Sequence, residues 1–390
     1  MSIEWKETEL GKIAFTTSGG TPSRKNENYY SGGTIPWVKS GELEFGTITK
    51  TEEFITQAGI DNSSAKIFPK GTLLIALYGA TIGKLSFLGI DAATNQAVCG
   101  IFENDTVDLK YLYYFLLFQR PNLVRQGIGG AQPNISQTIL KKLMVPYPKE
   151  KSEQERIVAR IEELFSELDN GVETLKKTKQ QLAVYRQAVL KESFGEIKEY
   201  IPLGKITVSR LGKMLDKEKN TGILQPYLRN INVRWFSFDL SDLLEMRIEP
   251  EENEKYSVTK GDLIICEGGE PGRCAIWEQD ETIFYQKALH RVRFTDDSNP
   301  KFYMYYFWFA AQTGKLNPFF TGMGIKHLTG QSLVKVPVPT ARKEEQDLIV
   351  QEIESRLSVC DSIEKTVDTA LLQAEAMRQS ILKKAFEGRL

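Results

Sequence analysis

The chain is poor in the residues that metal sites and many hydrolases require. Only two histidines, His290 and His327, occur among its 390 residues, so a histidine-based metal site or a Ser-His-Asp triad is not expected. Its four cysteines are scattered, and Cys266 and Cys274 lack the second pair that a zinc site needs. We therefore expect reduced thiols, no metal and no cofactor held by this chain.

The sequence also lacks long apolar runs and an excess of charge of either sign. No window approaches the roughly 20 apolar residues of a membrane span, and the polar start MSIEWKETEL does not resemble a signal peptide. We expect a cytoplasmic protein that spans no membrane. Because the net charge is -1, binding to nucleic acid would require a local basic face or the help of a partner.

What the sequence does contain is a long internal repeat. EQERIVARIEELFSELD begins at Glu153, and EQDLIVQEIESRLSVCD begins at Glu345. Further matching pairs keep their order along the chain: LGKI at Leu10 and Leu203, KGTLLIA at Lys70 and KGDLIIC at Lys260, GATIGK at Gly79 and GGEPGR at Gly268, Gln96 and Gln286, YLYYFLLF at Tyr111 and YMYYFWFA at Tyr303, GIG at Gly127 and GMG at Gly322, and VPYP at Val145 and VPVP at Val336. This order indicates a tandem duplication.

The duplication predicts four consecutive parts: a globular half at 1–150, a long helix at 151–195, a second globular half at 196–340 and a second long helix at 341–390. Each half shows short strands, such as 71–77 and 261–266, and then one apolar, aromatic helix, at 109–119 or 302–313. Strands followed by a helix, without regular alternation, favour the α+β class. The stretch from Thr21 to Phe54 has almost no similarity to Lys213–Met246, so we expect one scaffold with two different surfaces.

The two long segments have the pattern of coiled-coil helices. In the first, an apolar residue recurs every seven positions, at Ile161, Leu168, Leu175, Leu182 and Val189. The second has a weaker apolar seam, which favours pairing with the first helix over pairing with a copy of itself. We expect an antiparallel pair within the chain, with dimerisation of two chains as the alternative. Gly171 would permit a bend or a close approach of the partner helix.

The ends of the two helices, YRQAVLKESF and MRQSILKKAF, repeat more than their apolar positions. We interpret this repetition as more than packing requires, and as a surface that partner proteins use twice. Its residues are Arg186, Gln187, Leu190, Lys191, Phe194, Arg378, Gln379, Leu382, Lys383 and Phe386.

Together these features resemble a known family. The two junctions VPYPKEKSEQERIV and VPVPTARKEEQDLIV lead into long helices that end in R-Q-x-[VI]-L-K-x-x-F. IPWVKSGEL at Ile35 and PYLRNINV at Pro226 are also similar to segments of its target-recognition domains. Over essentially its whole length, the chain resembles the DNA specificity subunit of type I restriction-modification systems.

The resemblance implies a function and a set of partners. Each globular half would be a target-recognition domain that reads one half of a bipartite, asymmetric site in double-stranded DNA. The helix pair would set the spacing between the half-sites and dock two methyltransferase subunits, and restriction subunits would join for cleavage. S-adenosylmethionine, ATP and magnesium would belong to those partners, so this chain would be noncatalytic.

Candidates for DNA contact are the polar residues near the glycine-rich turns, because Arg, Lys, Asn and Gln side chains read base edges. In the first half they are Thr21, Ser23, Arg24, Lys25, Lys39, Tyr78, Thr81, Lys84, Asn95, Gln96, Gln126 and Gln132. In the second half they are Arg210, Lys213, Tyr227, Arg229, Asn230, Glu267, Arg273, Gln286, Lys287, His290, Lys326 and His327. For each of them a solvated side chain or turn residue is the competing interpretation, and for the two histidines a structural role is favoured.

Two other classes of function stay open. A coiled-coil assembly scaffold that binds no DNA would account for the near-neutral charge. A self-contained endonuclease would need an acidic metal site, and the pair Glu196 and Lys198 lacks a preceding acidic partner in a convincing place. We predict no catalytic residues in this chain.

Overall fold

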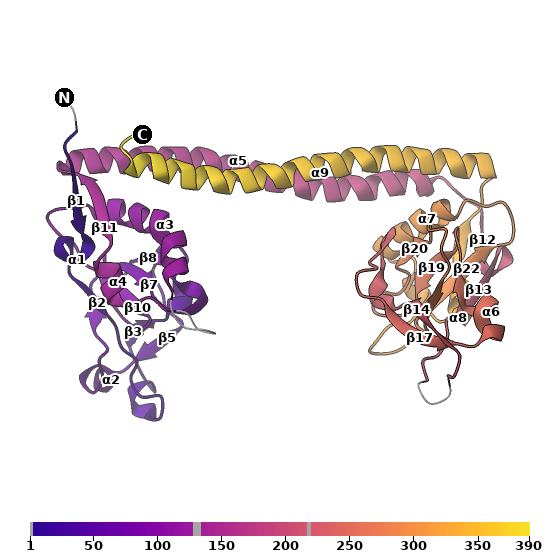
Figure 1. Cartoon of the computed structure of the whole chain (residues 1–390), viewed down its shortest axis with the longest axis horizontal. Helices are drawn as coiled ribbons and strands as arrows, with labels where there is room; N and C mark the ends of the chain where they lie inside the picture. The colour runs from indigo at the N-terminus through magenta and orange to yellow at the C-terminus, as the bar shows by residue number, and fades with distance from the viewer. Residues whose placement is uncertain (1–2, 128–133, 217–219) are drawn as a thin grey trace. The chain divides into compact units, whose positions relative to one another are not determined.

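The computed structural model describes residues 3–127, 134–216 and 220–390. The chain divides into two compact units (Figure 1): unit 1 is Met1–Leu175 with Thr369–Leu390, and unit 2 is Lys176–Asp368. Each unit thus joins one globular half to a segment of both long helices, where the sequence predicts four consecutive parts. The predicted α+β class is confirmed, because each unit combines small sheets with separate helices.

Unit 1 contains two small sheets beside helix α3 (Leu109–Gln126). The first sheet has the order β2 (Thr16–Ser18), β10 (Val98–Ile101), β7 (Leu73–Ala76), β8 (Leu85–Leu88) and β4 (Thr47–Ile48). The second has the order β5 (Glu53–Ile55), β3 (Ile35–Val38), β9 (Ala92–Thr94) and β6 (Ile67–Phe68). Strand β1 (Trp5–Glu9) pairs with β11 (Met144–Pro148), and short helices α1 (Leu10–Ile13), α2 (Gln57–Asp61) and α4 (Gln137–Lys141) complete the unit.

Unit 2 repeats this plan beside helix α7 (Pro300–Gln312). Its first sheet has the order β13 (Thr207–Leu211), β22 (Leu289–Phe294), β19 (Leu263–Cys266) and β20 (Cys274–Ile276). Its second has the order β17 (Leu244–Ile248), β14 (Ile223–Leu228), β21 (Ile283–Tyr285) and β18 (Ser257–Val258). Strand β12 (Tyr200–Pro202) pairs with β23 (Pro337–Pro339), β15 (Val233–Arg234) pairs with β16 (Ser237–Phe238), and α6 (Asn253–Tyr256) and α8 (Gly330–Leu333) complete the unit.

Strand pairing shows which residues of the two units are equivalent. Strand β3 runs parallel to β9 with Val38 opposite Thr94, and β14 runs parallel to β21 with Leu228 opposite Tyr285. The dissimilar stretches therefore share one topology. This register makes Asn95, rather than Gln96, the counterpart of Gln286. The sequence alignment was wrong by one position there, because the two glutamines matched by residue type and not by strand register.

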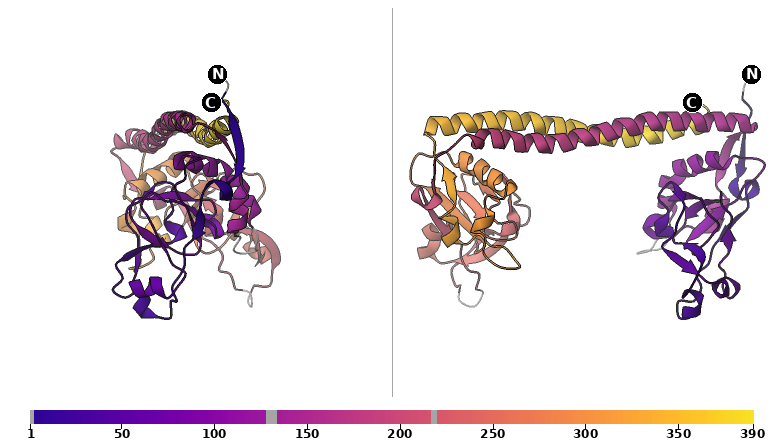
Figure 2. Two further views of the ribbon diagram at one scale, coloured as in Figure 1. Left: turned by 90° about the vertical axis from the view of Figure 1, so that its left-hand side faces the viewer. Right: turned by 180° about the vertical axis from the view of Figure 1, so that it is seen from behind.

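The long helices α5 (Lys151–Gly195) and α9 (Lys343–Phe386) pair antiparallel in each unit (Figure 2), as the sequence predicts. In unit 2 the partner's number falls as the number along α5 rises, in the ion pairs Lys179–Asp368 at 2.8 Å, Arg186–Asp361 at 2.7 Å and Glu192–Arg356 at 2.8 Å. In unit 1, Asp169 pairs with Arg378. Gly171 does not mark a close approach, because a Cβ there would meet open space within the described part of the chain.

Each globular half is held by the start of one long helix and the end of the other. In unit 1, the ring of Phe386 near the end of α9 packs against Tyr111 and Phe115 of α3, at 5.2 and 5.5 Å between centroids. Ile161 near the start of α5 is buried in the same core. In unit 2, Phe194 at the end of α5 packs at 5.3 Å from Phe302 of α7, and Val350, Ile353 and Leu357 near the start of α9 complete that core.

Helix α3 is longer than its predicted range of 109–119. It continues through Pro121 to Gln126, and Leu123 in this extension is fully buried in the core of unit 1. Packing of Leu123 thus holds residues in the helix that the proline would otherwise release.

Candidate nucleic-acid interface

In unit 1 most candidate residues gather where strands β2, β3, β7 and β9 end. Three backbone hydrogen bonds hold these ends together: Gly20 N–H to Thr94 O at 2.9 Å, Asn95 N–H to Val38 O at 2.9 Å and Leu77 N–H to Ala97 O at 2.8 Å. We call the resulting set, residues 19–25, 39–42, 78–84 and 95–96, the strand-end surface of unit 1. It contains Thr21, Ser23, Arg24, Lys25, Lys39, Tyr78, Thr81, Lys84, Asn95 and Gln96.

The strand-end surface of unit 2 comprises residues 212–213, 229–232, 267–273, 286–288 and 321–327. Its segments are joined by Lys213 N–H to Tyr285 O at 3.0 Å and Glu267 N–H to Ala288 O at 2.9 Å. Nine of the twelve candidates of this half lie in it, whereas Arg210 on β13, Tyr227 on β14 and His290 on β22 lie on the strands beside it. The candidates within the segments are Lys213, Arg229, Asn230, Glu267, Arg273, Gln286, Lys287, Lys326 and His327.

Arg273 is the centre of a polar network on the surface of unit 2. Its guanidinium donates to Asn230 Oδ1 at 2.9 Å and to the Asn230 carbonyl at 3.1 Å, and it pairs with Glu270 at 2.9 Å. Asn230 Nδ2 in turn donates to Gly268 O at 2.6 Å, and Arg229 pairs with Asp242 at 2.7 Å. The Nε atoms of Arg229 and Arg273 are buried without a partner among the described residues. These two arginines are fixed in place, and their unpaired Nε donors lie inside the unit rather than at its surface.

The surface of unit 1 holds a cation in a different way. The Arg24 guanidinium lies 4.4 Å from the Tyr30 ring centroid and 5.0 Å from that of Trp37, and it pairs with Glu53 at 2.6 Å. Lys39 pairs with Glu53 at 3.0 Å. Partial burial disfavours the ionised Glu53 carboxyl, but hydrogen bonds from Arg24 and Lys39 hold its pKa below the ordinary value. Of the four candidate cations on this surface, Arg24 and Lys39 are paired, and Lys25 and Lys84 have no ion-pair partner among the described residues. Lys25 and Lys84 are therefore the two candidate cations most available to a ligand.

Some candidates are not accessible. Tyr227 is buried on β14. Lys213 is buried and pairs with Glu249 and Glu252. His290 is buried with Nε2 2.9 Å from Leu328 O, and burial lowers its pKa, so a neutral imidazole inside the unit is expected. Gln126 is the exposed last residue of α3, outside the strand-end surface. Gln132 lies outside the described residues.

The repeated helix ends are accounted for largely by packing. Leu190, Phe194, Leu382 and Phe386 are buried in the cores of the two units. Arg186 and Arg378 form ion pairs between the helices, and Gln379 is half-buried. Of the ten residues, Gln187, Lys191 and Lys383 are exposed, so these three are the ones that a partner protein would meet.

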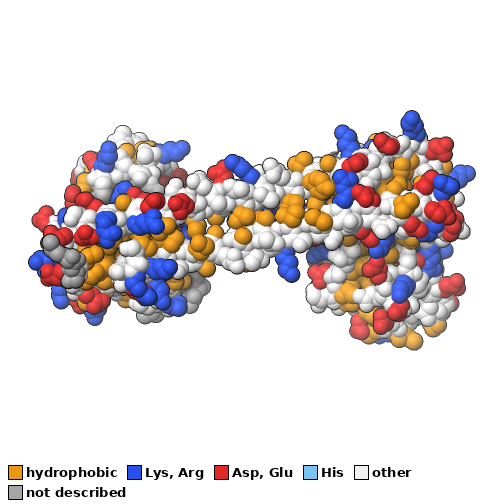
Figure 3. All heavy atoms as spheres, turned by 90° about the horizontal axis from the view of Figure 1, so that it is seen from above, with side chains coloured by type: hydrophobic (Ala, Val, Ile, Leu, Met, Phe, Trp, Pro, Cys, Tyr) orange, Lys and Arg blue, Asp and Glu red, His pale blue; other side chains and the backbone are white. Residues whose placement is uncertain are grey.

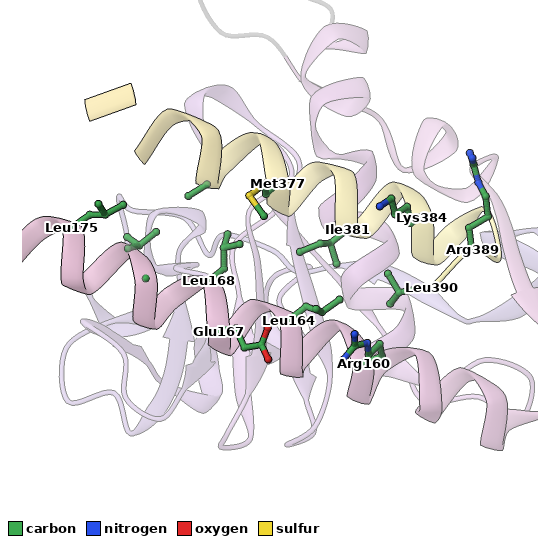
Figure 4. A pocket seen from close by; sticks show the side chains of 13 residues that line it. Arg160, Leu164, Glu167, Leu168, Leu175, Met377, Ile381, Lys384, Arg389 and Leu390 are labelled. Atoms are coloured by element: carbon green, nitrogen blue, oxygen red, sulfur yellow. The ribbon is translucent and has the colours of Figure 1, made fainter. Parts of the chain in front are cut away.

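A second surface lies on the long helices. In unit 1 a groove of about 630 Å³ runs between α5 and α9 (Figure 4), where Leu164 and Leu168 of α5 face Met377 and Ile381 of α9. Arg160, Lys384 and Arg389 lie at one end of it (Figure 4). Apolar side chains are visible along the outer face of the helices (Figure 3). Exposed apolar grooves of this kind are typical of protein interaction sites.

Across the described ranges, no cluster of three or more His, Cys, Asp or Glu side chains could hold a metal ion. None of the helices within those ranges is long and apolar enough to cross a membrane.

The two-copy fold and the paired strand-end surfaces define a class of protein with two similar recognition domains on a helical frame. The chain belongs to the family of type I restriction modification DNA specificity domains, because the family's model matches residues 2–183 and again residues 204–373. The two matches correspond to the two copies of the repeat.

Named relatives agree with this assignment. The chain is 24% identical over 392 residues to the type I restriction enzyme EcoKI specificity subunit of Escherichia coli (strain K12), covering 93% of this chain and 84% of that protein. A chain from a solved type I R-M system has a TM-score of 0.79 at 16% identity and covers 100% of both chains. The HsdS subunit from Thermoanaerobacter tengcongensis has a TM-score of 0.62 at 17% identity, covering 99% of this chain and 97% of that one. The two solved structures show the fold.

Sequence reasoning missed part of the surface of unit 2. Met323 and Ile325 are exposed beside the candidates Lys326 and His327. The signal was present in the repeat, since GMG at Gly322 matches GIG at Gly127. That match shows that the glycines are repeated, but it does not show which side chains between them are exposed.

Proposed function

We propose that this chain is the noncatalytic DNA sequence-recognition subunit of a type I restriction-modification complex. Each globular half reads one half of a bipartite, asymmetric site in double-stranded DNA through its strand-end surface. The observation that carries this proposal is that one backbone arrangement occurs twice with different side chains, for example Lys84 in unit 1 and Arg273 in unit 2. Two equal readers would recognise a symmetric site, whereas two unlike readers recognise an asymmetric one.

The chemistry of both surfaces supports DNA as the ligand. The available cations Lys25, Lys84 and Lys287 suit phosphate contacts, which position a protein on the duplex. Asn95, Gln96 and Gln286 carry amide groups of the kind that read adenine, and Arg229 and Arg273 carry the forked donors that suit guanine. Because Tyr227, His290 and Lys213 are buried, we assign them to support of the surface instead of base contact.

The long helices have a separate function, which is to bind the partner subunits and to set the spacing of the DNA site. We assign the groove between α5 and α9 in unit 1 to docking of a methyltransferase subunit, with a second methyltransferase and restriction subunits in the complete complex. S-adenosylmethionine, ATP and magnesium act in those subunits. The same helices set the spacer of the DNA site, so a four-residue insertion near Thr178 with a compensating one in α9 changes the spacer and leaves both half-sites intact.

The test is methylation of random DNA by this chain purified with its methyltransferase, with modified adenines located by sequencing. The expected result is a motif with two unlike halves and a fixed gap. DNA binding by the complex should weaken as salt rises, because phosphate contacts release counterions. A stable complex that modifies DNA without a shared motif, or that shows no salt-dependent binding, would support a scaffold role. Cleavage by the purified chain with magnesium alone would overturn the noncatalytic assignment.

A further inference from the structure

One part of the strand-end surface of unit 2 has an apolar tip. Residues Thr321–His327, which we call the tip hairpin, are closed by two backbone hydrogen bonds between their ends: Thr321 N–H to His327 O at 2.8 Å and His327 N–H to Thr321 O at 2.9 Å. Every residue of the hairpin is exposed. Met323 is fully exposed, and Ile325 has 73% of its surface exposed. Two large apolar side chains at one projecting tip are not needed for the core.

The base of the tip hairpin is anchored in the strand-end surface of unit 2. Leu328, directly after the hairpin, is fully buried, and its N–H donates to Glu267 O at 2.7 Å. His327 lies so close to the turn after β19 that a Cβ on Gly268 would stand 3.0 Å from its Nδ1 atom. The same turn carries Arg273 and accepts a hydrogen bond from Asn230. The tip therefore projects from the polar network that we assign to DNA reading.

The two glycines of the tip differ in whether the backbone requires glycine at that position. Gly322 has φ of +96°, and a Cβ there would lie 2.3 Å from Ile325 O, so the turn itself requires glycine. Gly324 has no positive φ, and within the described residues a Cβ on it would meet open space. The fold does not require glycine at 324. Its missing side chain leaves the backbone open to the close approach of a ligand.

We propose that the tip hairpin enters the major groove of the half-site read by unit 2, and that Met323 and Ile325 contact thymine methyl groups there. The tip hairpin, a short loop closed by the single Thr321–His327 bridge, is narrow enough to enter the major groove, which is roughly 12 Å wide and admits even a two-stranded ribbon. Apolar side chains distinguish thymine there by its methyl group. Gly324 lets the backbone pass close to the base edges, and exposed Lys326 follows the apolar pair toward the phosphates. In the sequence repeat, GIG at Gly127 matches GMG at Gly322, but the residues after Gly127 lie outside the described part of the chain.

The proposal rests on the DNA-reading function and is tested in the complete complex with the methyltransferase. The double variant Met323→Ala/Ile325→Ala and the variant Gly324→Val are compared with Val208→Ala, which truncates another exposed apolar side chain, near the start of β13. Binding to the motif found for the unaltered complex is measured against salt concentration. Modified adenines are mapped on random DNA.

The expected result is a loss of affinity of roughly fivefold or more for both tip variants, the lower end of the effect of one mismatched base pair. The salt slope should be unchanged for the apolar truncation, while Lys326→Ala should reduce it by about one. Thymine preference should relax in the half-site of unit 2 alone. Val208→Ala should leave binding and motif as they are.

Three results overturn the proposal. Unchanged affinity and motif in both tip variants would show that the hairpin does not touch DNA. Loss of the methyltransferase from the complex, with the subunit still folded by circular dichroism, would make the tip a protein contact. If the unaltered complex itself has no bipartite motif, the DNA-reading function fails before any tip variant is compared.

Discussion

Gly20 in unit 1 and Lys213 in unit 2 occupy the same place, two residues after the ends of the equivalent strands β2 and β13. Gly20 N–H donates to Thr94 O at 2.9 Å, and Lys213 N–H donates to the equivalent Tyr285 O at 3.0 Å. A Cβ on Gly20 would lie 2.3 Å from Ser64 Oγ, whereas Lys213 extends to Glu249 and Glu252. Backbone contact fills the site in one unit and a buried ion pair fills it in the other. Strand pairing is thus retained while the strand ends are free to change chemistry.

Phe45 and Phe236 show how far the common backbone extends into dissimilar sequence. Both have left-handed φ angles, of 61° and 67°, although neither is glycine. Phe45 N–H donates to Leu85 O at 2.8 Å, and Phe236 N–H donates to Cys274 O at 3.1 Å. A left-handed non-glycine residue costs roughly 1 to 2 kcal/mol. The same costly conformation in both copies indicates that it holds the loop against the sheet.

The largest expected effect tests whether the two units are stabilised independently. Phe386→Ala should destabilise unit 1, and Phe194→Ala should destabilise unit 2, each by about 3 to 5 kcal/mol, because a buried aromatic ring is removed. Hydrogen exchange should report the loss in α3 for the first variant and in α7 for the second. Faster exchange of both helices in either variant would contradict independent units.

A smaller loss of stability is expected from substitutions at the two equivalent strand ends, at Lys213 in unit 2 and at Gly20 in unit 1. Lys213→Met should destabilise unit 2 by about 2 to 3 kcal/mol in denaturant unfolding, because two carboxylates lose their shared cation; the value is lower than for a fully buried pair. At the equivalent place Gly20→Ala should cost about 1 to 3 kcal/mol, since its Cβ would collide with Ser64 and the backbone of Ala65. Equal stability of Lys213→Met and the unaltered chain would show that the ion pair only balances its own desolvation.

The ion pair also predicts a pH dependence that belongs to unit 2. Hydrogen bonding from Lys213 lowers the pKa of Glu249 to about 2, below an ordinary value of about 4.3. Stability from this pair is therefore complete above about pH 4.5 and is lost as the pH falls toward 2. Denaturant unfolding between these pH values should show a smaller decline in Lys213→Met. An identical decline in both proteins would assign the acid sensitivity to other carboxylates.

A functional comparison uses the equivalent cations Lys84 and Arg273. Lys84→Ala should weaken DNA binding by the complex about uniformly across sequences and lower the salt slope by about one, as for a phosphate contact. Arg273→Ala should instead relax the motif in the half-site of unit 2, with a cost of about 1 to 3 kcal/mol against the preferred base. Binding titrations at several salt concentrations, together with the methylation motif, measure both. The reverse pattern would exchange the roles of the two residues.

The smallest effect compares the two long helices. Gly171→Ala should raise the stability of unit 1 by about 0.5 to 1 kcal/mol, because glycine lowers helix stability and the new Cβ meets no described atom within 4 Å. Thermal unfolding of the variant and the unaltered chain gives the difference. A destabilised variant would mean that Gly171 is needed for a helix contact.

Much of this fold could be predicted from the sequence because the duplication presents each pattern in two copies. Apolar runs such as those of β7 and β19, the aromatic helices and the coiled-coil repeat depend on local periodicity, so they were readable. The buried state of Tyr227 and Lys213 was not, because it depends on which strands flank them in space. Pro121 likewise stays in α3 only because Leu123 finds a distant core. In the tip hairpin, the glycines indicate a turn, but they do not indicate that Met323 and Ile325 are exposed at its tip.

The path of the chain through unit 1 has a consequence for its synthesis. Leu382, Ala385 and Phe386 complete the core around α3, and every residue of unit 2 precedes them in the chain. A polypeptide growing from its N-terminus can close unit 2 as soon as Asp368 has emerged. The globular half of unit 1 is synthesised first, but the aromatic residues of its core stay uncovered until the end of α9 has been synthesised. Folding would then finish in the reverse order of translation, and a stalled ribosome would leave the older half exposed to chaperones.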